Sequence, residues 1–86
     1  MARKPHVRTY SRRRCGLCDE AREVVEAELR ATPFEWEEIF IDGSDDLERR
    51  YGLRVPVVEV NGREEFEYRV DPGRLHGLVT GGSVTL

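Results

Sequence analysis

The stretch RRRCGLCDEA, residues 12–21, holds both cysteines of the chain, with two residues between them and three arginines in front. Apolar residues then recur at helical spacing along one stripe, at Leu17, Ala21, Val24, Val25 and Leu29. Acidic residues fall largely off this stripe, and Thr32-Pro33 interrupts the pattern. The spacing therefore predicts a helix of about four turns that carries the cysteine pair at its N-terminus.

Segments on both sides of this helix have the composition of strands. HVRTYS, residues 6–11, precedes the cysteines, and FEWEEIFID, residues 34–42, follows the helix. The second segment contains three consecutive apolar residues near its end, as strands buried on both faces do. We therefore expect it to be a central strand that runs parallel to the first.

A hairpin is predicted further along the chain. Residues 57–60 and 63–70 flank Asn61-Gly62, and this dipeptide is a strong signal for a two-residue turn between antiparallel strands. Alternation places three apolar side chains on one face of the second hairpin strand, those of Phe66, Tyr68 and Val70.

Two short helices complete the order of elements. Residues 45–51 are expected to form a helix that Ser44 caps and Gly52 closes. A last helix is predicted to begin at Asp71-Pro72-Gly73, where proline is tolerated in the first turn. The order β-α-β-α-β-β-α predicts one α/β domain over residues 1–86, with a four-stranded mixed sheet flanked by helices. Its core covers residues 6–79, and residues 80–86 are expected to be a flexible tail.

Composition and charge exclude several classes of function. A chain of 86 residues that is 38% hydrophobic and 36% charged has the composition of one soluble domain. Its apolar stretches are far shorter than the ~20 residues that cross a bilayer, and the N-terminus lacks a secretory apolar run, so we expect a cytoplasmic protein without a membrane partner. Residues 1–14 are basic, but all 17 acidic residues lie in the remainder, which would repel phosphate. Nucleic acid is therefore not an expected partner.

The spacing of the cysteines suits redox chemistry. With Cys15 at the N-cap and Cys18 one turn further, both sulfurs can close a small disulfide ring, and only Cys15 would face solvent. Free N–H groups of the first turn, the helix dipole and residues 12–14 all favour the thiolate form of Cys15. We therefore expect the pKa of the Cys15 thiol well below that of a free cysteine.

Two other uses of the cysteines are compatible with a Cys-x-x-Cys pair. A zinc site needs four ligands, and His6 and His76 lack the spacing that would complete one with the cysteine pair, so no metal site is expected. Both histidines are interpreted as ordinary surface side chains. Two incidental buried cysteines remain possible.

Two segments carry a resemblance to a known family. TYSRRRCGLCDEA, residues 9–21, resembles the active-site stretch of short bacterial glutaredoxin-like proteins of the thioredoxin superfamily. FIDGSDDLERRYGLRVPVVEVNG, residues 40–62, extends the resemblance with an Ile-Asp, a Leu-x-x-x-Tyr-Gly helix and a Val-Pro. The resemblance covers roughly residues 6–79 and implies a thioredoxin-like fold.

The resemblance also implies a function and roles for particular residues. It implies thiol–disulfide exchange with Cys15 as the nucleophile and Cys18 as the resolving thiol. It implies that Pro56 is a cis-proline facing the cysteine pair across a substrate groove. A cis bond there would turn the Val55 backbone N–H and C=O toward the extended chain of a substrate.

The expected partners follow from the arginines near the cysteine pair and from the resemblance to glutaredoxins. Arg13, Arg14 and Arg54 are candidates to bind a carboxylate of the substrate. No bound cofactor is expected, and glutathione or another low-molecular-weight thiol is a candidate reductant. Gly16-Leu17 stands where better characterised glutaredoxins have Pro-Tyr, and residues 70–73 stand where they have a Gly-Gly pair. The expected partners are a disulfide-containing protein or a low-molecular-weight thiol, and we expect a monomer.

Two other functions stay open at this point. A thioredoxin-fold domain without catalysis could dock a partner in its groove, and replacing Cys15 by serine would then leave its function intact. An iron–sulfur or metal carrier would use Cys15 of two chains together with external thiols, and the fresh protein would then be coloured.

Overall fold

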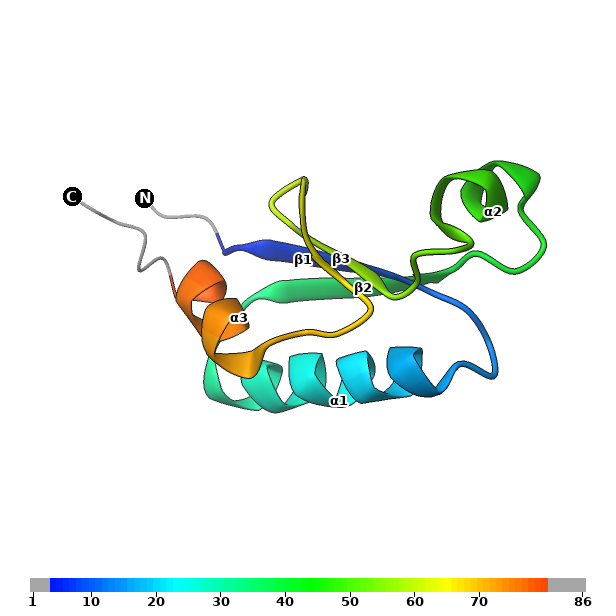
Figure 1. Cartoon of the computed structure of the whole chain (residues 1–86). Coiled ribbons are helices and arrows are strands. Elements are labelled where there is room, and N and C mark those ends of the chain that lie inside the picture. The colour runs from blue at the N-terminus through cyan, green and yellow to red at the C-terminus, as the bar shows by residue number, and fades with distance from the viewer. Residues whose placement is uncertain (1–3, 81–86) are drawn as a thin grey trace.

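A computed structural model describes residues 4–80 of the chain (Figure 1). The predicted order of elements is confirmed, with the bounds β1 (His6–Ser11), α1 (Gly16–Ala31), β2 (Glu35–Phe40), α2 (Asp45–Tyr51), β3 (Val57–Val60), β4 (Arg63–Glu67) and α3 (Pro72–Val79). The predicted tail begins at Thr80, the C-cap of α3, and the rest of it lies outside the described residues. Within residues 4–80, no helix is long and apolar enough to cross a membrane.

The four strands form one mixed sheet, as predicted, and their order in it is β2-β1-β3-β4. β1 runs parallel to β2 and antiparallel to β3, and β3 and β4 form the antiparallel hairpin. Since β1 and β3 are antiparallel neighbours, the C-terminal end of β1 lies beside the N-terminal end of β3. The loop that carries Cys15 and the segment that carries Pro56 therefore lie at the same end of these two strands.

The prediction that residues 34–42 form a central strand is wrong. β2 covers only Glu35–Phe40 and pairs on one side, with β1, so it is an edge strand. The apolar run Ile39-Phe40-Ile41 is explained by side chains that pack on the two faces of the sheet at the end of this strand. The guanidinium of Arg13 lies 4.9 Å from the ring centroid of Phe40, and the buried Ile41 follows the strand. Burial of the two faces does not require a neighbouring strand on each side.

The sheet separates two apolar clusters, and Figure 1 shows α1 and α3 on one side of it and α2 on the other. Strand side chains alternate between the clusters, since Val7 and Val58 face α1 whereas Tyr10 and Val57 face α2. The larger cluster also contains Ala21, Val25, Phe34, Val60, Phe66, Val70, Leu75 and Val79. The smaller cluster is completed by Ile41 and Tyr51.

A stacked pair of tyrosines fills the smaller cluster. The rings of Tyr10 and Tyr51 lie 4.0 Å apart between centroids, with an angle of 14° between their planes. Burial, and then the neighbouring Tyr10 hydroxyl, raise the pKa of Tyr51 to about 12. Tyr51 therefore stays neutral and holds α2 against the sheet.

The predicted turn at Asn61-Gly62 and the predicted cap Ser44 are confirmed, and Asp71, where the last helix was expected to begin, is the N-cap of α3. Asn61 and Gly62 have φ angles of 53° and 85°, as the two-residue hairpin turn requires. The Leu47 N–H donates to Ser44 Oγ over 3.2 Å at the start of α2. The Arg74 N–H donates to Asp71 Oδ2 over 2.8 Å at the start of α3. These are local interactions, so short sequence patterns are enough to predict them.

One face of the hairpin differs from the prediction. Phe66 and Val70 are buried, but Tyr68 is largely exposed and β4 ends at Glu67. Tyr68 has a φ of 68°, in the left-handed region, so the alternation of the strand stops there. Its N–H donates to the Pro56 carbonyl and its hydroxyl donates to the Leu53 carbonyl, each over 2.8 Å. These two hydrogen bonds hold Tyr68 out of the core.

Leu75 gives a test of how α3 packs. Its side chain is fully buried in the larger cluster, so Leu75→Ala should destabilise the protein by about 2–5 kcal/mol. Leu53→Ala is the matched control, because Leu53 is 91% exposed, and it should change stability by less than about 0.5 kcal/mol. Urea unfolding measures both. Equal effects of the two variants would contradict this packing.

Glu28 gives a test based on pH. The Thr32 hydroxyl, and then His76 of α3, lower the pKa of Glu28 below its ordinary value of about 4.3. The ionised carboxylate therefore stabilises the fold above that ordinary value, and the stabilisation is lost as the pH falls through the lowered pKa. Glu28→Gln should be less stable than the wild type at pH 7, and the difference should shrink below about pH 4. A difference independent of pH between about 7 and 3 would contradict this role.

Candidate functional site

The site begins with a cysteine that caps a helix. Cys15 is the N-cap of α1, with extended backbone angles (φ −126°, ψ 110°), as predicted. The Cys18 N–H donates to Cys15 Sγ over 3.1 Å, so the sulfur occupies the position in which a serine or aspartate oxygen usually accepts this bond. Free N–H groups and the positive end of the helix dipole both favour negative charge on this sulfur.

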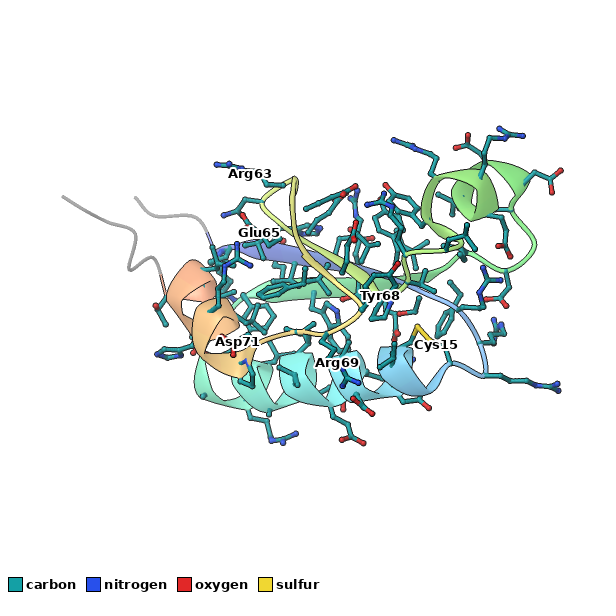
Figure 2. The ribbon with its side chains drawn as sticks, viewed as in Figure 1. Cys15, Arg63, Glu65, Tyr68, Arg69 and Asp71 are labelled. Atoms are coloured by element: carbon teal, nitrogen blue, oxygen red, sulfur yellow. A yellow bond between two sulfur atoms is a disulfide. The ribbon has the colours of Figure 1, made fainter. Side chains whose placement is uncertain are left out.

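The two cysteines form a disulfide, and Figure 2 shows it at the N-terminal end of α1. Their Cα atoms lie 5.2 Å apart. Cys18 is fully buried, whereas Cys15 is only half-buried. Of the two sulfurs, that of Cys15 is therefore the one that an incoming molecule would meet first.

The three arginines before Cys15 have different surroundings. Arg13 and Arg14 are exposed; Arg13 lies over the Phe40 ring and its N–H donates to Asp42 Oδ1 over 3.0 Å. Arg12 instead forms a two-point ion pair with Glu48 of α2. The positive charge expected in front of Cys15 is therefore supplied mainly by Arg13 and Arg14, because a carboxylate offsets the charge of Arg12.

The segment before β3 runs beside the end of β1. Tyr10 pairs with Val57, so Pro56 continues β3 past Tyr10 toward Ser11. The Val55–Pro56 peptide bond is cis, Pro56 is buried, and its carbonyl accepts the N–H of Tyr68. Within residues 4–80, the backbone N–H and C=O of Val55 have no hydrogen-bond partner. They are free to pair with another extended chain.

Arg54 is held by carboxylates of the hairpin. Its guanidinium donates to Glu64 over 2.9 Å and to Glu67 over 2.6 Å, and it stacks on the ring of Tyr51. The same contact lowers the pKa of Glu64. Three arginines were predicted to bind a carboxylate of the substrate. Arg13 and Arg14 lie next to Cys15 in an exposed loop, whereas Arg54 is already paired with Glu64 and Glu67.

Both histidines contact carboxylates. His6 Nε2 lies 2.8 Å from Glu37 Oε2, and His76 Nδ1 lies 2.7 Å from Glu28 Oε2. In the part of the chain that the structure describes, no group of three or more histidine, cysteine, aspartate or glutamate side chains is arranged to hold a metal ion.

Some features of the site were not predicted from the sequence. The pair Arg12–Glu48 and the contact of Arg13 with Asp42 join residues that are 36 and 29 positions apart. Charged residues are abundant in this chain, so no sequence pattern distinguishes these partners from others. The position of α2 beside the end of β1 brings Glu48 to Arg12, and the parallel pairing of β1 with β2 brings Asp42 to Arg13.

Comparison with known proteins places this geometry in context. A family model described as "Glutaredoxin-like domain (DUF836)" matches residues 6–79. Target protein XcR50 from X. campestris is 39% identical over 87% of this chain and 96% of its own, with a TM-score of 0.68. Protein Ne2328 from Nitrosomonas europaea is 29% identical over 99% of this chain and 96% of its own, with a TM-score of 0.72. None of the curated proteins matches.

A more distant likeness concerns the fold alone. A thioredoxin from Halobacterium salinarum is 24% identical over 96% of this chain and 78% of its own, with a TM-score of 0.66. The strand order and the three helices agree with this likeness. The predicted thioredoxin-like fold is therefore confirmed.

The different exposure of the two sulfurs can be tested on reduced protein. Iodoacetamide should modify Cys15 before Cys18, and its rate should reach half its maximum at a pH below the value of about 8.5 that is typical of a free thiol. Mass spectrometry identifies the labelled residue, and Cys15→Ser is the control, in which labelling of Cys18 should be slow. A half-maximum near 8.5, or faster labelling of Cys18, would contradict activation by the helix N-terminus.

Proposed function

Because the chain belongs to the glutaredoxin-like family, we propose that it is a small thiol–disulfide oxidoreductase that reduces protein disulfides or mixed disulfides. One observation carries the proposal. Cys15 Sγ accepts a hydrogen bond from the Cys18 N–H at the start of α1, and it forms a disulfide with the buried Cys18. This arrangement supplies an accessible nucleophile and a resolving thiol within one helical turn.

The first step uses Cys15. Its thiolate attacks one sulfur of the substrate disulfide, the substrate S–S bond breaks, and one substrate thiolate leaves. The Cys18 N–H and the other free N–H groups of the first turn stabilise the attacking thiolate. The product is a mixed disulfide between Cys15 and the substrate.

The second step uses Cys18. Its thiol loses a proton to water, the thiolate attacks Cys15 Sγ, and the second substrate sulfur leaves as a thiolate. The two steps transfer two electrons to the substrate and produce the Cys15–Cys18 disulfide. Two molecules of a low-molecular-weight thiol, such as glutathione, then reduce this disulfide in two further exchanges, leave as their own disulfide and return Cys15 and Cys18 to thiols.

The substrate is held beside Cys15. The free N–H and C=O of Val55 pair with the extended backbone of the substrate, and Pro56 contributes no N–H of its own at this end of the strands. Arg13 and Arg14 bind a carboxylate of the substrate or of the reducing thiol. Arg54 takes part only by exchanging Glu64 or Glu67 for such a carboxylate.

Serine variants of the two cysteines test the proposal. Cys15→Ser should reduce a protein disulfide or a glutathione-mixed disulfide no faster than the uncatalysed reaction, because the nucleophile is lost. Cys18→Ser should still attack and should accumulate the mixed disulfide, which mass spectrometry detects as an adduct on Cys15.

The control is Arg49→Ala, which alters an exposed side chain on α2 and should keep full activity. Omitting glutathione from the assay tests it as the reductant. Full function in Cys15→Ser would contradict the proposal and would favour a domain that only docks its partner.

A further inference from the structure

Arg12 joins three parts of the molecule. Its Nη1 and Nη2 donate to the two carboxylate oxygens of Glu48 over 2.8 and 2.7 Å, and Nη2 also donates to the Gly52 carbonyl over 3.0 Å. Its backbone N–H donates to Cys18 Sγ, with 3.5 Å between the nitrogen and the sulfur. We call the contacts of the guanidinium with Glu48 and Gly52 the Arg12 clamp.

The clamp restricts the backbone beside the buried sulfur. Two parallel N–H···O bonds fix the plane of a guanidinium, so the guanidinium of Arg12 is held in one orientation against α2. Glycine at position 52 keeps this space open, because a Cβ there would lie 3.2 Å from Arg12 Nη2 and would overlap the Glu48 carbonyl. The loop before α1 is thereby fastened to the end of α2.

The Cys18 sulfur, which accepts the Arg12 N–H, must become a thiolate in the second step of the proposed reaction. Cys18 is fully buried, and burial disfavours a thiolate. A backbone N–H aimed at the sulfur favours the charged form, and its hydrogen bond strengthens when the sulfur carries negative charge. The Arg12 N–H therefore contributes most at the moment when Cys18 becomes the nucleophile.

We propose that Arg12 is a positioning residue for the resolving step, in which its clamp to Glu48 and Gly52 holds the Arg12 N–H against Cys18 Sγ and speeds the attack of Cys18 on the mixed disulfide. The inference rests on the proposed function, because it concerns the second step of that reaction. It assigns to Arg12 an internal role that differs from the substrate contacts proposed for Arg13 and Arg14.

A disulfide with coloured leaving groups separates the two steps. Dithiobis(nitrobenzoate) releases one coloured thiolate when Cys15 attacks it and a second when Cys18 resolves the mixed disulfide. Mixing reduced protein with excess reagent should therefore give two phases of absorbance. The first rate rises with the reagent concentration, and the second, intramolecular rate does not.

Two variants break the clamp with opposite changes of charge. Arg12→Ala removes a positive charge and Glu48→Ala removes a negative one. If the clamp positions the N–H, both should slow the second phase, Arg12→Ala by about tenfold, which corresponds to ~1.4 kcal/mol. The first phase should change by less than about twofold. If charge alone matters, the two variants should shift the second phase in opposite directions.

Matched control residues lie on α2, the helix that carries Glu48. Asp46→Ala and Arg49→Ala make the same changes of charge at an exposed pair with 3.9 Å between its charged atoms. Both should keep the wild-type rate of the second phase. Arg12→Lys and Glu48→Gln are milder variants that serve if an alanine variant does not fold, and each should slow the second phase less than the alanine change.

The outcomes separate the inference from the proposed function. If the wild type shows two phases and both clamp variants leave the second phase unchanged, or shift it in opposite directions, the role of Arg12 is overturned and the oxidoreductase proposal stands. If the wild type releases no coloured thiolate faster than Cys15→Ser does, the oxidoreductase proposal itself fails. Slowing of the second phase in both clamp variants, with unchanged controls, supports the role of Arg12.

Discussion

The hydrogen bond from the Cys18 N–H to Cys15 Sγ is the contact on which fold and site both depend. A helix start leaves N–H groups without partners, and proteins usually satisfy one of them with an oxygen of serine, threonine, aspartate or asparagine. Here a sulfur takes that position. The need of the helix for a cap and the need of a thiol for stabilised negative charge are therefore met by the same group.

The sheet provides the second half of the site. β1 and β3 are antiparallel neighbours, so the loop after β1 and the Val55–Pro56 segment before β3 meet at the same end of these strands, although some 40 residues separate them. The hydrogen bonds of Tyr68 to the Pro56 and Leu53 carbonyls hold this segment from the hairpin side. The Arg12 clamp holds the loop from the side of α2. Polar contacts thus fasten each half of the site to the scaffold, in addition to the apolar packing of Val55 against the smaller cluster.

Local patterns in the sequence predicted most of the fold and the cysteine pair. Helical spacing, Asn61-Gly62, the cap Ser44 and the helix start at Asp71-Pro72 act over a few residues, so they can be recognised without knowing the tertiary structure. The edge position of β2, the left-handed Tyr68 and the partners of Arg12 could not be recognised in this way. Each depends on contacts between segments distant in the chain, and an apolar run indicates that faces are covered but not which strands lie alongside.

The position of β2 at an edge has a consequence for encounters between copies of the chain. Exposed strand edges offer unpaired backbone groups that can add a strand from another molecule. The two edge strands here are EWEEIF and REEFE, and each carries three glutamates. A second copy that approached either edge in register would bring carboxylates opposite carboxylates, and like charges directly opposite each other are destabilising. The acidic edges therefore protect the sheet against growth by strand addition.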